Sequence, residues 1–546
     1  MRWPVAARAA VALGIPLTVT TLLGHQTFGL LIGTGVFTVL YGAGRPLRTR
    51  LVLLLTVGLA MVASVFVGTL TTGNPLVSIV VVAAIGMVAT QISHALRLGA
   101  PGAFFFVLLA GVGGYLPAHG VHPGTLVAAT AIGAAVAVVV AMSDLVVRPR
   151  GPQEDAVAAA RTAVDAFVKA GSAAPDAELR SATATDALHD AWTTLADGGD
   201  PVSGDARARA LVADLHRVQH TYSGFQLPGD VPDPELHAEV TEGPLGQPSV
   251  QRMLRRSLRW PTSALQAAVR VGAGVTIAGL IAWTAGTDHV YWAMAAAMLV
   301  LHNGLDRKNT MIRSVHRLVG TVLGLGLFLA VHALVDLGGP WVLVITLVVL
   351  QGAVELLVVR NYAAAVLFIT PLALTIGTAG TGAAVGDVAL ERLLDTAIGI
   401  TVAVAVPWLV FRRGTPGLVR AHLARVLTSA AAALDHLGAG THRRPVGRAG
   451  LRDLAVDMQE LSGVVRRGLQ DDPDGIAELL EVREATAWLG FTVLARGCTQ
   501  IEPASRMEGA AGACRRMAAQ LRQGVVPAAE EVRAVRAAAG ALGEDD

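Results

Sequence analysis

Charge, lysine, cysteine and aromatic side chains are all scarce in this chain of 546 residues. Charged residues account for 15% of the sequence and aromatic ones for 5%, whereas 53% of the residues are hydrophobic. This composition excludes an ordinary soluble enzyme and predicts a polytopic membrane protein. Only Lys169 and Lys308 are lysines among 43 basic residues, a bias that suggests a GC-rich bacterial genome.

Motifs that would indicate catalysis or cofactor binding are also missing. The sequence has no G-x-x-x-x-G-K-[ST] phosphate loop and no candidate pair of nucleophile and base, and His119 and His122 are too few for a metal site. We therefore expect no enzymatic activity, no cofactor, no metal and no nucleic-acid partner. Cys498 and Cys514 both lie near the C-terminus, so we expect unpaired thiols in a reduced cytoplasmic compartment.

The charges that are present alternate along the chain. Residues 1–150 carry a net charge of +7, residues 151–250 carry −10, residues 251–415 carry +6, and the remainder is nearly neutral. The two basic blocks are also the apolar ones. This alternation predicts two membrane domains and two cytoplasmic helical domains, with boundaries at 1–149 (membrane), 150–258 (cytoplasmic), 259–413 (membrane) and 414–546 (cytoplasmic).

The two apolar blocks repeat each other. TAIG occurs at Thr130–Gly133 and at Thr396–Gly399, and eight of eleven residues are identical between 130–140 and 396–406. A duplicated helix bundle in a bilayer usually encloses a path between its copies. Segments of about 20 apolar residues can cross the hydrocarbon, and the sequence predicts about 12 of them in two six-helix repeats: 7–23, 27–43, 51–70, 75–95, 102–117, 124–143, 270–286, 290–304, 318–335, 341–359, 361–378 and 393–411.

Arginine marks one side of the membrane in both repeats. It collects before the first span, in RPLRTR (45–50) and in RPR (148–150), and again in QRMLRRSLR (251–259) and FRRG (411–414). The positive-inside rule therefore places both ends of each repeat in the cytoplasm, so the repeats are parallel. Apolar residues at helical spacing in the two soluble blocks predict two small helical bundles in contact with each other. We expect a multi-pass protein of the bacterial inner membrane with both termini cytoplasmic.

Three segments of the second half carry a family resemblance. DHVYWAMAAAMLVLHNGLDRKNTMIRSVHRLVGTVLG (288–324), NYAAAVLFITP (361–371) and RLLDTAIG (392–399) resemble the fusaric acid resistance family of aromatic acid exporters. Tryptophan on one helix followed by R-x-x-G-T on the next also resembles plant aluminium-activated malate transporters, which are anion channels. The resemblance implies movement of organic anions, commonly out of the cytoplasm.

Basic residues of the second half are the candidate anion contacts. Arg313 and Arg317 share a helix face one turn apart, and Gly320 and Gly324 continue that stripe as a packing edge. Guanidinium groups on such a face can hold carboxylates bidentately. Arg313 and Arg317 can equally be topology anchors. Arg270 is a third candidate.

Acidic residues and a second group of charges lie elsewhere in the same half. Glu355, inside a span, is either a structural partner of Arg317 or Arg270 or a protonatable coupling group. Arg392 and Asp395 fall on the R-x-x-D-T pattern of the family at the expected outer end of the last span. Leu54, Leu126 and Ala129 stand at the first-repeat positions that match Arg317, Arg392 and Asp395.

Remaining polar and aromatic residues have weaker assignments. His302 can join a cytoplasmic vestibule as a donor or simply mark a helix end, and Tyr291 and Trp292 most simply anchor the outer membrane interface. The sequence thus predicts an exporter of aromatic or other organic carboxylate anions. The alternatives are an organic-anion channel and a membrane scaffold or sensor. The expected partners are small organic anions and the lipid bilayer, with homo-oligomerisation left open.

Overall fold

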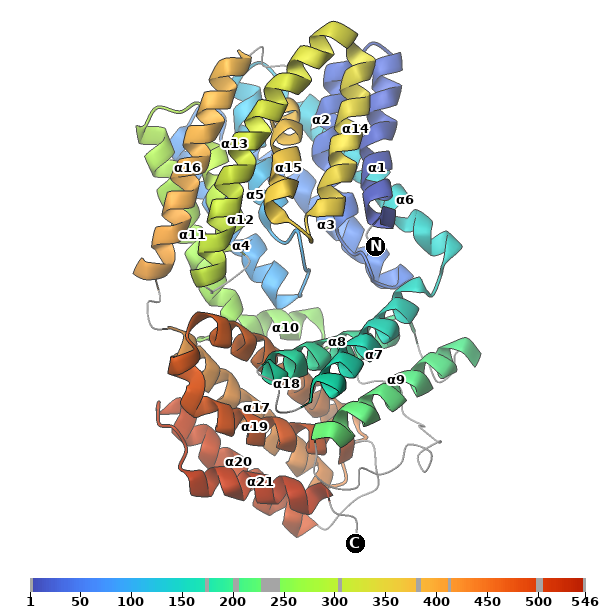
Figure 1. The fold of residues 1–546 in the computed structure, drawn as a ribbon, viewed down its shortest axis with the longest axis vertical. Coiled ribbons are helices and arrows are strands. Elements are labelled where there is room, and N and C mark those ends of the chain that lie inside the picture. Colours follow the sequence, from blue (N-terminus) through green and yellow to red (C-terminus); the bar gives the residue numbers. More distant parts are fainter. Residues whose placement is uncertain are drawn as a thin grey trace. The chain divides into compact units, whose positions relative to one another are not determined.

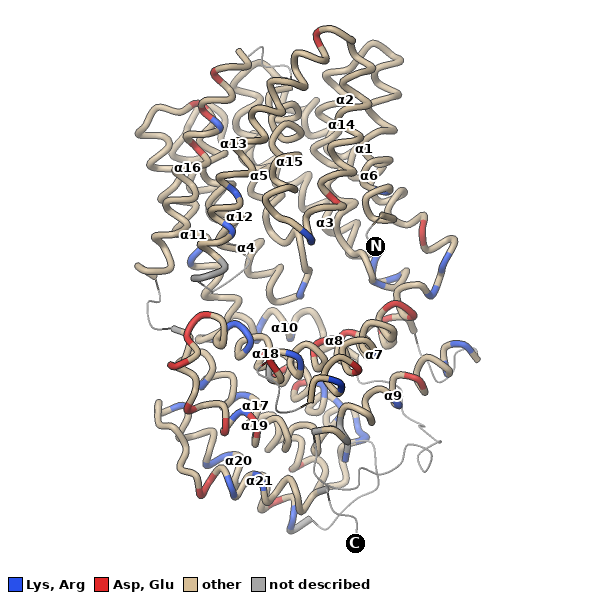
Figure 2. Tube along the Cα trace, viewed as in Figure 1, with Lys and Arg blue, Asp and Glu red and all other residues tan. Residues whose placement is uncertain are grey.

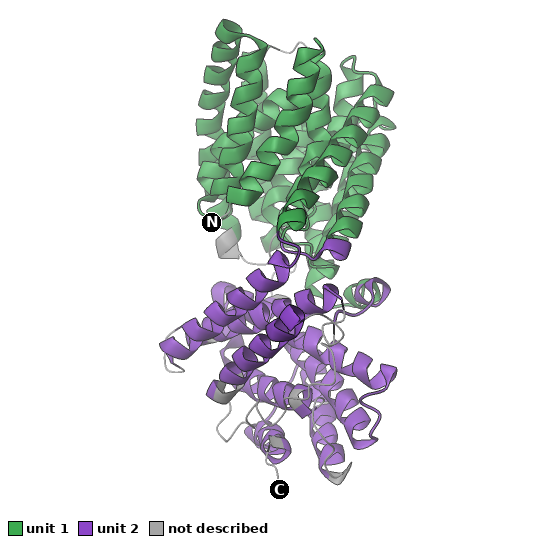
Figure 3. Ribbon diagram, turned by 90° about the vertical axis from the view of Figure 1, so that its right-hand side faces the viewer, with its two compact units in different colours: residues 1–43, 50–147, 254–412 green, residues 44–49, 148–253, 413–546 purple. Residues whose placement is uncertain are grey.

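The computed structural model describes residues 3–171, 176–199, 206–226, 246–302, 307–379, 384–410, 414–496 and 504–543, and this part of the chain is helical without strands. The chain divides into two compact units (Figure 3). Unit 1 comprises residues 1–43, 50–147 and 254–412, and unit 2 comprises 44–49, 148–253 and 413–546. Figure 2 shows charged residues sparse along the helices of unit 1 and frequent in unit 2.

Unit 1 is built from two sets of apolar helices, one from each apolar block (Figure 1). Seven of its described helices are long and apolar enough to cross a membrane, and four helical segments are apolar but shorter: 26–40, 104–118, 290–301 and 362–377. The first set is α1 (Trp3–Leu22), α2 (Gln26–Val36) continued by the 3-10 helix η1 (Phe37–Leu40), α3 (Leu47–Thr69), α4 (Pro75–Ala95), α5 (Phe104–Ala118) and α6 (Pro123–Val147). The second set is α11 (Ser263–Thr284), α12 (Val290–Leu301), α13 (Arg307–Gly338), α14 (Pro340–Leu357), α15 (Tyr362–Gly377) and α16 (Val385–Leu409).

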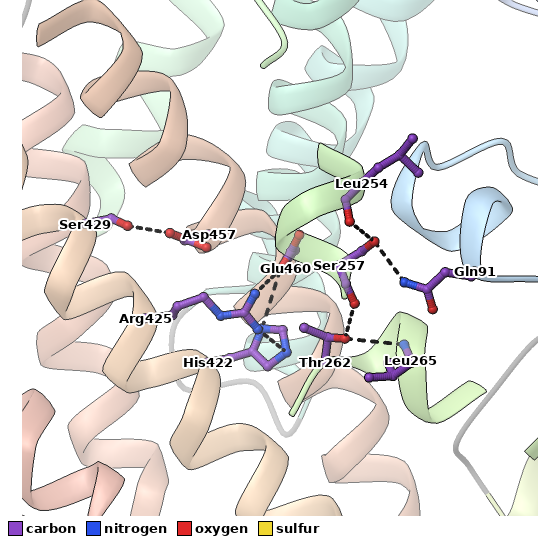
Figure 4. A network of polar contacts seen from close by, with 10 residues as sticks. All are labelled: Gln91, Leu254, Ser257, Thr262, Leu265, His422, Arg425, Ser429, Asp457 and Glu460. Atoms are coloured by element: carbon purple, nitrogen blue, oxygen red, sulfur yellow. Dashed lines mark hydrogen bonds and ion pairs between the residues drawn. The ribbon is translucent and has the colours of Figure 1, made fainter. Parts of the chain in front are cut away.

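Polar caps fix where several of these helices start. Asn74 accepts a hydrogen bond from the Val77 amide before α4, and Asn361 accepts one from the Ala364 amide before α15. Such caps satisfy amides that have no partner within the helix. Thr262 does the same for α11 and donates to the Ser257 carbonyl at 2.6 Å, as Figure 4 shows.

Helices at corresponding positions of the two sets make the same packing contacts. α1 packs on α2 and α6, as α11 packs on α12 and α16, and α2 packs on α6 as α12 does on α16. Across the sets, α1 contacts α14 as α11 contacts α4, and α2 contacts α15 as α12 contacts α5. Glycines allow the closest approaches: a Cβ on Gly133 would lie 2.1 Å from the Ile32 carbonyl oxygen, and one on Gly399 would lie 2.4 Å from that of Ala293.

Unit 2 collects both soluble blocks into one helical body. Its helices are α7 (Gly151–Ala170), α8 (Ala177–Asp197), α9 (Ala206–Gln226), α17 (Gly414–Gly438), α18 (Pro445–Asp471), α19 (Pro473–Arg496), α20 (Ala504–Arg522) and α21 (Ala529–Gly543), and the short α10 (Val250–Ser257) spans the boundary with unit 1. The two blocks meet where α8 packs on α18, with an ion pair of 2.7 Å between Asp186 and Arg466.

Polar side chains link two helices of unit 2. Arg425 donates to Glu460 at 3.2 Å, and the Ser429 hydroxyl donates to Asp457 at 2.5 Å, linking α17 to α18 (Figure 4). Cys514 is a free, fully buried cysteine, and burial raises the pKa of its thiol to about 12. Cys498, predicted to be equally unpaired, lies outside the described residues.

Three helices of the second set begin well before the predicted spans. α11 begins at Ser263 rather than near residue 270, α13 at Arg307 rather than near residue 318, and α16 at Val385 rather than near residue 393. In α13 and α16 the additional turns contain charged residues, which lower the hydropathy of a segment without breaking its helix. Arg317 and Arg392 therefore lie well inside helices. Arg392 and Asp395 were expected in the first turn of the last span, and they lie two to three turns inside α16.

Candidate functional site

Two arginines, Arg317 of α13 and Arg392 of α16, lie in the interior of unit 1. At about 1.5 Å per residue, Arg317 lies roughly 15 Å from the start of α13, and Arg392 lies roughly 10 Å from the start of α16. α13 packs against α16, and the two guanidinium groups lie within electrostatic range of each other. The side chains are 1% and 3% exposed. The fold thus brings together two residues that are 75 positions apart in sequence.

Arg317 is buried without compensation. None of its three guanidinium nitrogens has a hydrogen-bond partner in the described part of the chain. Three buried hydroxyls on the helices around it, those of Tyr291 on α12, Thr321 on α13 and Thr396 on α16, are also unpartnered. A buried polar group without a partner costs free energy, and a buried charge costs more. This group of donors therefore indicates a site for an acceptor that is not part of the protein.

Arg392 is held more firmly than Arg317. Its guanidinium carbon lies 5.1 Å from the ring centroid of Trp292, a cation–π arrangement that stabilises a cation away from water. Asp395 lies one turn further along α16 and is fully buried. It accepts a hydrogen bond of 3.0 Å from the Thr287 hydroxyl, and its second oxygen has no partner among the described residues. Asp395 lies within electrostatic range of Arg392.

Aromatic rings gather next to Arg392. His289 stacks on Trp292 with ring centroids 3.8 Å apart and planes 9° apart, and Tyr115 of α5 lies 4.3 Å from His289 and 5.5 Å from Tyr291. His289 also contacts the Glu391 carboxylate. The expectation that Tyr291 and Trp292 anchor an outer interface is wrong, because both are buried. They form one wall beside a cationic group, and α5 of the first set contributes to it.

Arg313 and His302 belong to a different location. Arg313 is partly exposed and lies within electrostatic range of His302. His302 is buried at the end of α12, where its Nδ1 lies 3.1 Å from the Met298 carbonyl and its own carbonyl accepts a hydrogen bond of 2.7 Å from His94. The imidazole thus contacts a carbonyl in the last turn of α12, and its ring lies next to Gly102.

The proposed pairing of Glu355 with Arg317 does not form. Glu355 on α14 and Arg270 on α11 are both buried, and each has interactions of its own. Arg317 has no hydrogen-bond partner within the described residues, so Glu355 does not neutralise it. Helix rotation explains the outcome: Gly320 and Gly324, on the same stripe as Arg317, face α15, where an added Cβ would lie 2.6 Å from the Ala363 carbonyl oxygen and 2.8 Å from that of Leu367.

In the first set, the matching positions carry no charge. Leu54, Leu126 and Ala129 are all completely buried and apolar. Thr130, which matches Thr396, shares a hydrogen bond of 2.8 Å with Thr34. The unpartnered donors are therefore confined to the second set at these positions.

Arg50, which matches Arg313, is a structural residue. It is 1% exposed and pairs with Asp144 of α6 at 2.9 Å, and Asp144 also contacts Arg8 of α1. The pair joins three helices of the first set. It offers a control for the second set, because here a buried arginine has a carboxylate from the protein itself.

Five members of the site were not singled out from the sequence as site residues: Tyr115, Thr287, His289, Thr321 and Thr396. Thr396 could have been found, since it follows Asp395 in the family pattern. Tyr115 could not, because it lies on a helix of the other set. Among the described residues, no cluster of three or more His, Cys, Asp or Glu could hold a metal ion.

Comparison with known proteins gives two matches. A family model described as fusaric acid resistance protein-like matches residues 277–406. The uncharacterized membrane protein YvaC of Bacillus subtilis is 26% identical over 474 residues, which cover 77% of this chain and 75% of the relative. No solved structure matches the chain. The resemblance of the second half to the fusaric acid resistance family is therefore confirmed over these residues, and the matched segment contains Trp292, Arg317, Arg392 and Asp395.

Proposed function

We propose that this protein is a transmembrane transporter that exports organic carboxylate anions, including aromatic ones, from the bacterial cytoplasm. Its residues 277–406 match the fusaric acid resistance family. The observation that carries the proposal is the buried Arg317, without a partner in the described residues and within range of a second buried arginine. Arginine binds planar carboxylates through paired hydrogen bonds. An anion at this position would satisfy donors that the protein leaves open.

The arrangement of short helices supports a binding site in the middle of unit 1. The four short apolar segments are the second and fifth of each set, and they contact one another across the sets, α2 with α15 and α5 with α12. At about 1.5 Å per residue, none reaches the roughly 30 Å of a bilayer core. Short segments at corresponding positions of two repeats are typical of transporter binding sites. The matching helix pairs support the proposal of two six-helix repeats.

The aromatic wall supports a preference for ring-bearing substrates. Trp292, His289 and Tyr115 present stacked or tilted rings beside Arg392. A planar aryl carboxylate could place its ring against this wall while its carboxylate meets the guanidinium groups. Aliphatic anions would keep the charge interaction and lose the stacking.

Replacing Arg317 with methionine tests the proposal. Methionine fills a similar apolar volume and removes a buried charge that has no partner, so Arg317→Met should leave the thermal stability of the purified protein unchanged or raise it. Transport of aryl carboxylates into inside-out membrane vesicles should fall at least about tenfold, because a charge-assisted contact contributes about 1.5–3 kcal/mol. Transport is measured at matched protein levels.

Arg50→Met is the matched control from the first set. It breaks an ion pair between a buried arginine and the partly exposed Asp144, so stability should fall by about 1–2 kcal/mol while transport per folded molecule is retained. The opposite pattern, an Arg317→Met protein that is destabilised yet transports fully, would contradict the proposal and assign Arg317 to structure.

A further inference from the structure

We propose that a stack of four aromatic rings is the outer gate of the arginine site, and that it opens where Tyr115 meets His289. The proposal rests on the proposed function, because a gate serves only a site through which an anion passes. It concerns unit 1 alone, at the end where α12 and α16 begin. The positive-inside rule places this end outside the cytoplasm.

An anion bound at the arginines can leave only if part of the fold moves. Arg317 and Arg392 are 1% and 3% exposed. At about 1.5 Å per residue, Arg392 lies roughly 10 Å from the start of α16, so the outer end is the nearer end of that helix. The side chains that cover Arg392 on this side therefore determine whether the site is open or closed.

A continuous stack of rings lies between Arg392 and the exposed end of unit 1. Trp292 is 5.1 Å from the Arg392 guanidinium carbon, and His289 stacks on Trp292 with centroids 3.8 Å apart. Tyr115 lies 4.3 Å from His289, and the exposed His119 lies 4.0 Å from Tyr115. Tyr115, His289 and Trp292 are buried. The stack thus runs from an exposed ring to a buried arginine.

The stack consists of two blocks, one from each set of helices. Tyr115 and His119 lie one turn apart at the end of α5, with the His119 Nδ1 2.9 Å from the Tyr115 carbonyl oxygen. His289 and Trp292 open α12, where the Trp292 amide donates to the His289 carbonyl at 2.7 Å, and Glu391 of α16 contacts the His289 ring. The blocks meet at the faces of Tyr115 and His289, whose planes are 32° apart. Ring faces separate without breaking a hydrogen bond, so this seam is where the stack parts most easily.

A close helix crossing just inside the seam provides a pivot. A Cβ on Gly111, one turn before Tyr115 on α5, would lie 2.3 Å from the Cβ of Tyr291 on α12. Small residues allow such close contact between helices in a membrane, and transporters alternate access largely by rocking one bundle against another. Rocking about this crossing would part Tyr115 from His289 while α5 and α12 stay in contact deeper in the fold.

A thiol placed in the arginine site tests whether the stack closes it. Thr396→Cys is introduced into a chain from which the two native cysteines are removed by Cys498→Ser and Cys514→Ala. Intact spheroplasts present only the outer face of the membrane. The probe is sulfonatoethyl methanethiosulfonate, an anionic and membrane-impermeant reagent, and the rate at which it modifies the thiol measures access from outside.

Tyr115→Ala and His289→Ala each remove one ring from the seam. Both should be modified roughly two- to tenfold faster than the parent, because losing one stacked pair shifts the balance of closed and open states by about that factor. His119→Ala is the matched control: it removes the exposed outermost ring, leaves the seam intact and should be modified at the parent rate. Either seam variant suffices if the other fails to fold.

Thr130→Cys separates opening of the gate from general loosening. Thr130 is the matching buried position of the first set, and a thiol there should be modified no faster when Tyr115→Ala is added. Equal acceleration at positions 130 and 396, an unchanged rate at 396, or a thiol at 396 that never reacts overturns the gate. Labelling does not require transport, so a wild type that moves no aryl carboxylate would contradict the proposed function while the labelling rates still decide the gate.

Discussion

The two sets of helices differ most in the charge of their buried side chains. At matching buried positions, one set has Leu126 and Ala129, and the other has Arg392 and Asp395. Leucine and alanine need only packing, whereas the charged pair also requires the Thr287 hydroxyl and the Trp292 ring. Because retaining buried charge costs stability, its confinement to one set favours a functional rather than an architectural use.

A histidine of unit 2 makes a pH-dependent contribution to stability. His216 of α9 packs edge-on against Trp192 of α8 with ring centroids 4.6 Å apart, and burial lowers its pKa below the ordinary value of 6.5. Above the unfolded pKa, the imidazole is neutral in both states and contributes nothing. As the pH falls through about 6.5, only the unfolded state gains the proton, so stability is lost.

His216→Phe should remove this dependence. Phenylalanine keeps an aromatic contact with Trp192 and cannot be protonated, so the variant should gain thermal stability relative to wild type as the pH falls from 7.5 to 5.5. Unfolding of both proteins is followed by circular dichroism across that range. Parallel stability profiles for the two proteins would contradict the assignment.

At the scale of helices, hydropathy located every apolar segment of unit 1 but placed the starts of α11, α13 and α16 too late. For α13 and α16 the reason is that charged residues occupy their early turns. Arg317, Arg392 and Asp395 could be named from the sequence. Their convergence could not, since it depends on the rotation of each helix and on where each begins.

Helix crossings at glycine give a prediction at this scale. Gly399→Ala would place a Cβ 2.4 Å from the Ala293 carbonyl oxygen, so α12 and α16 must move apart. We expect a loss of about 1–3 kcal/mol in stability from such overpacking. Gly326→Ala on α13 meets nothing within 4 Å and should be neutral or slightly stabilising, because alanine favours helix. Thermal unfolding of the purified variants compares them, and equal losses would refute the close-crossing argument.

For the whole molecule, the division into two units follows the alternation of charge along the chain. The sequence boundaries near 150, 258 and 413 lie within a few residues of the structural ones at 147, 253 and 412. The short segment 44–49 was not foreseen as part of unit 2. Within unit 2, Arg45 of this segment interacts electrostatically with Asp197 and Asp190 of α8, a long-range pairing that no local pattern reveals.

Membrane topology is the prediction that tests the whole arrangement. Each set contributes six helices, and an even number returns the chain to the side from which it entered, so the acidic block after Arg150 and the C-terminus after Asp546 should share a compartment. The arginines that flank both sets place that compartment in the cytoplasm. Alkaline phosphatase fused after either residue should therefore be inactive, whereas a fusion at Gly120, in the turn between α5 and α6, should be active. Activity after Arg150 would require an odd number of crossings in the first set, and the parallel relation of the two sets would no longer hold.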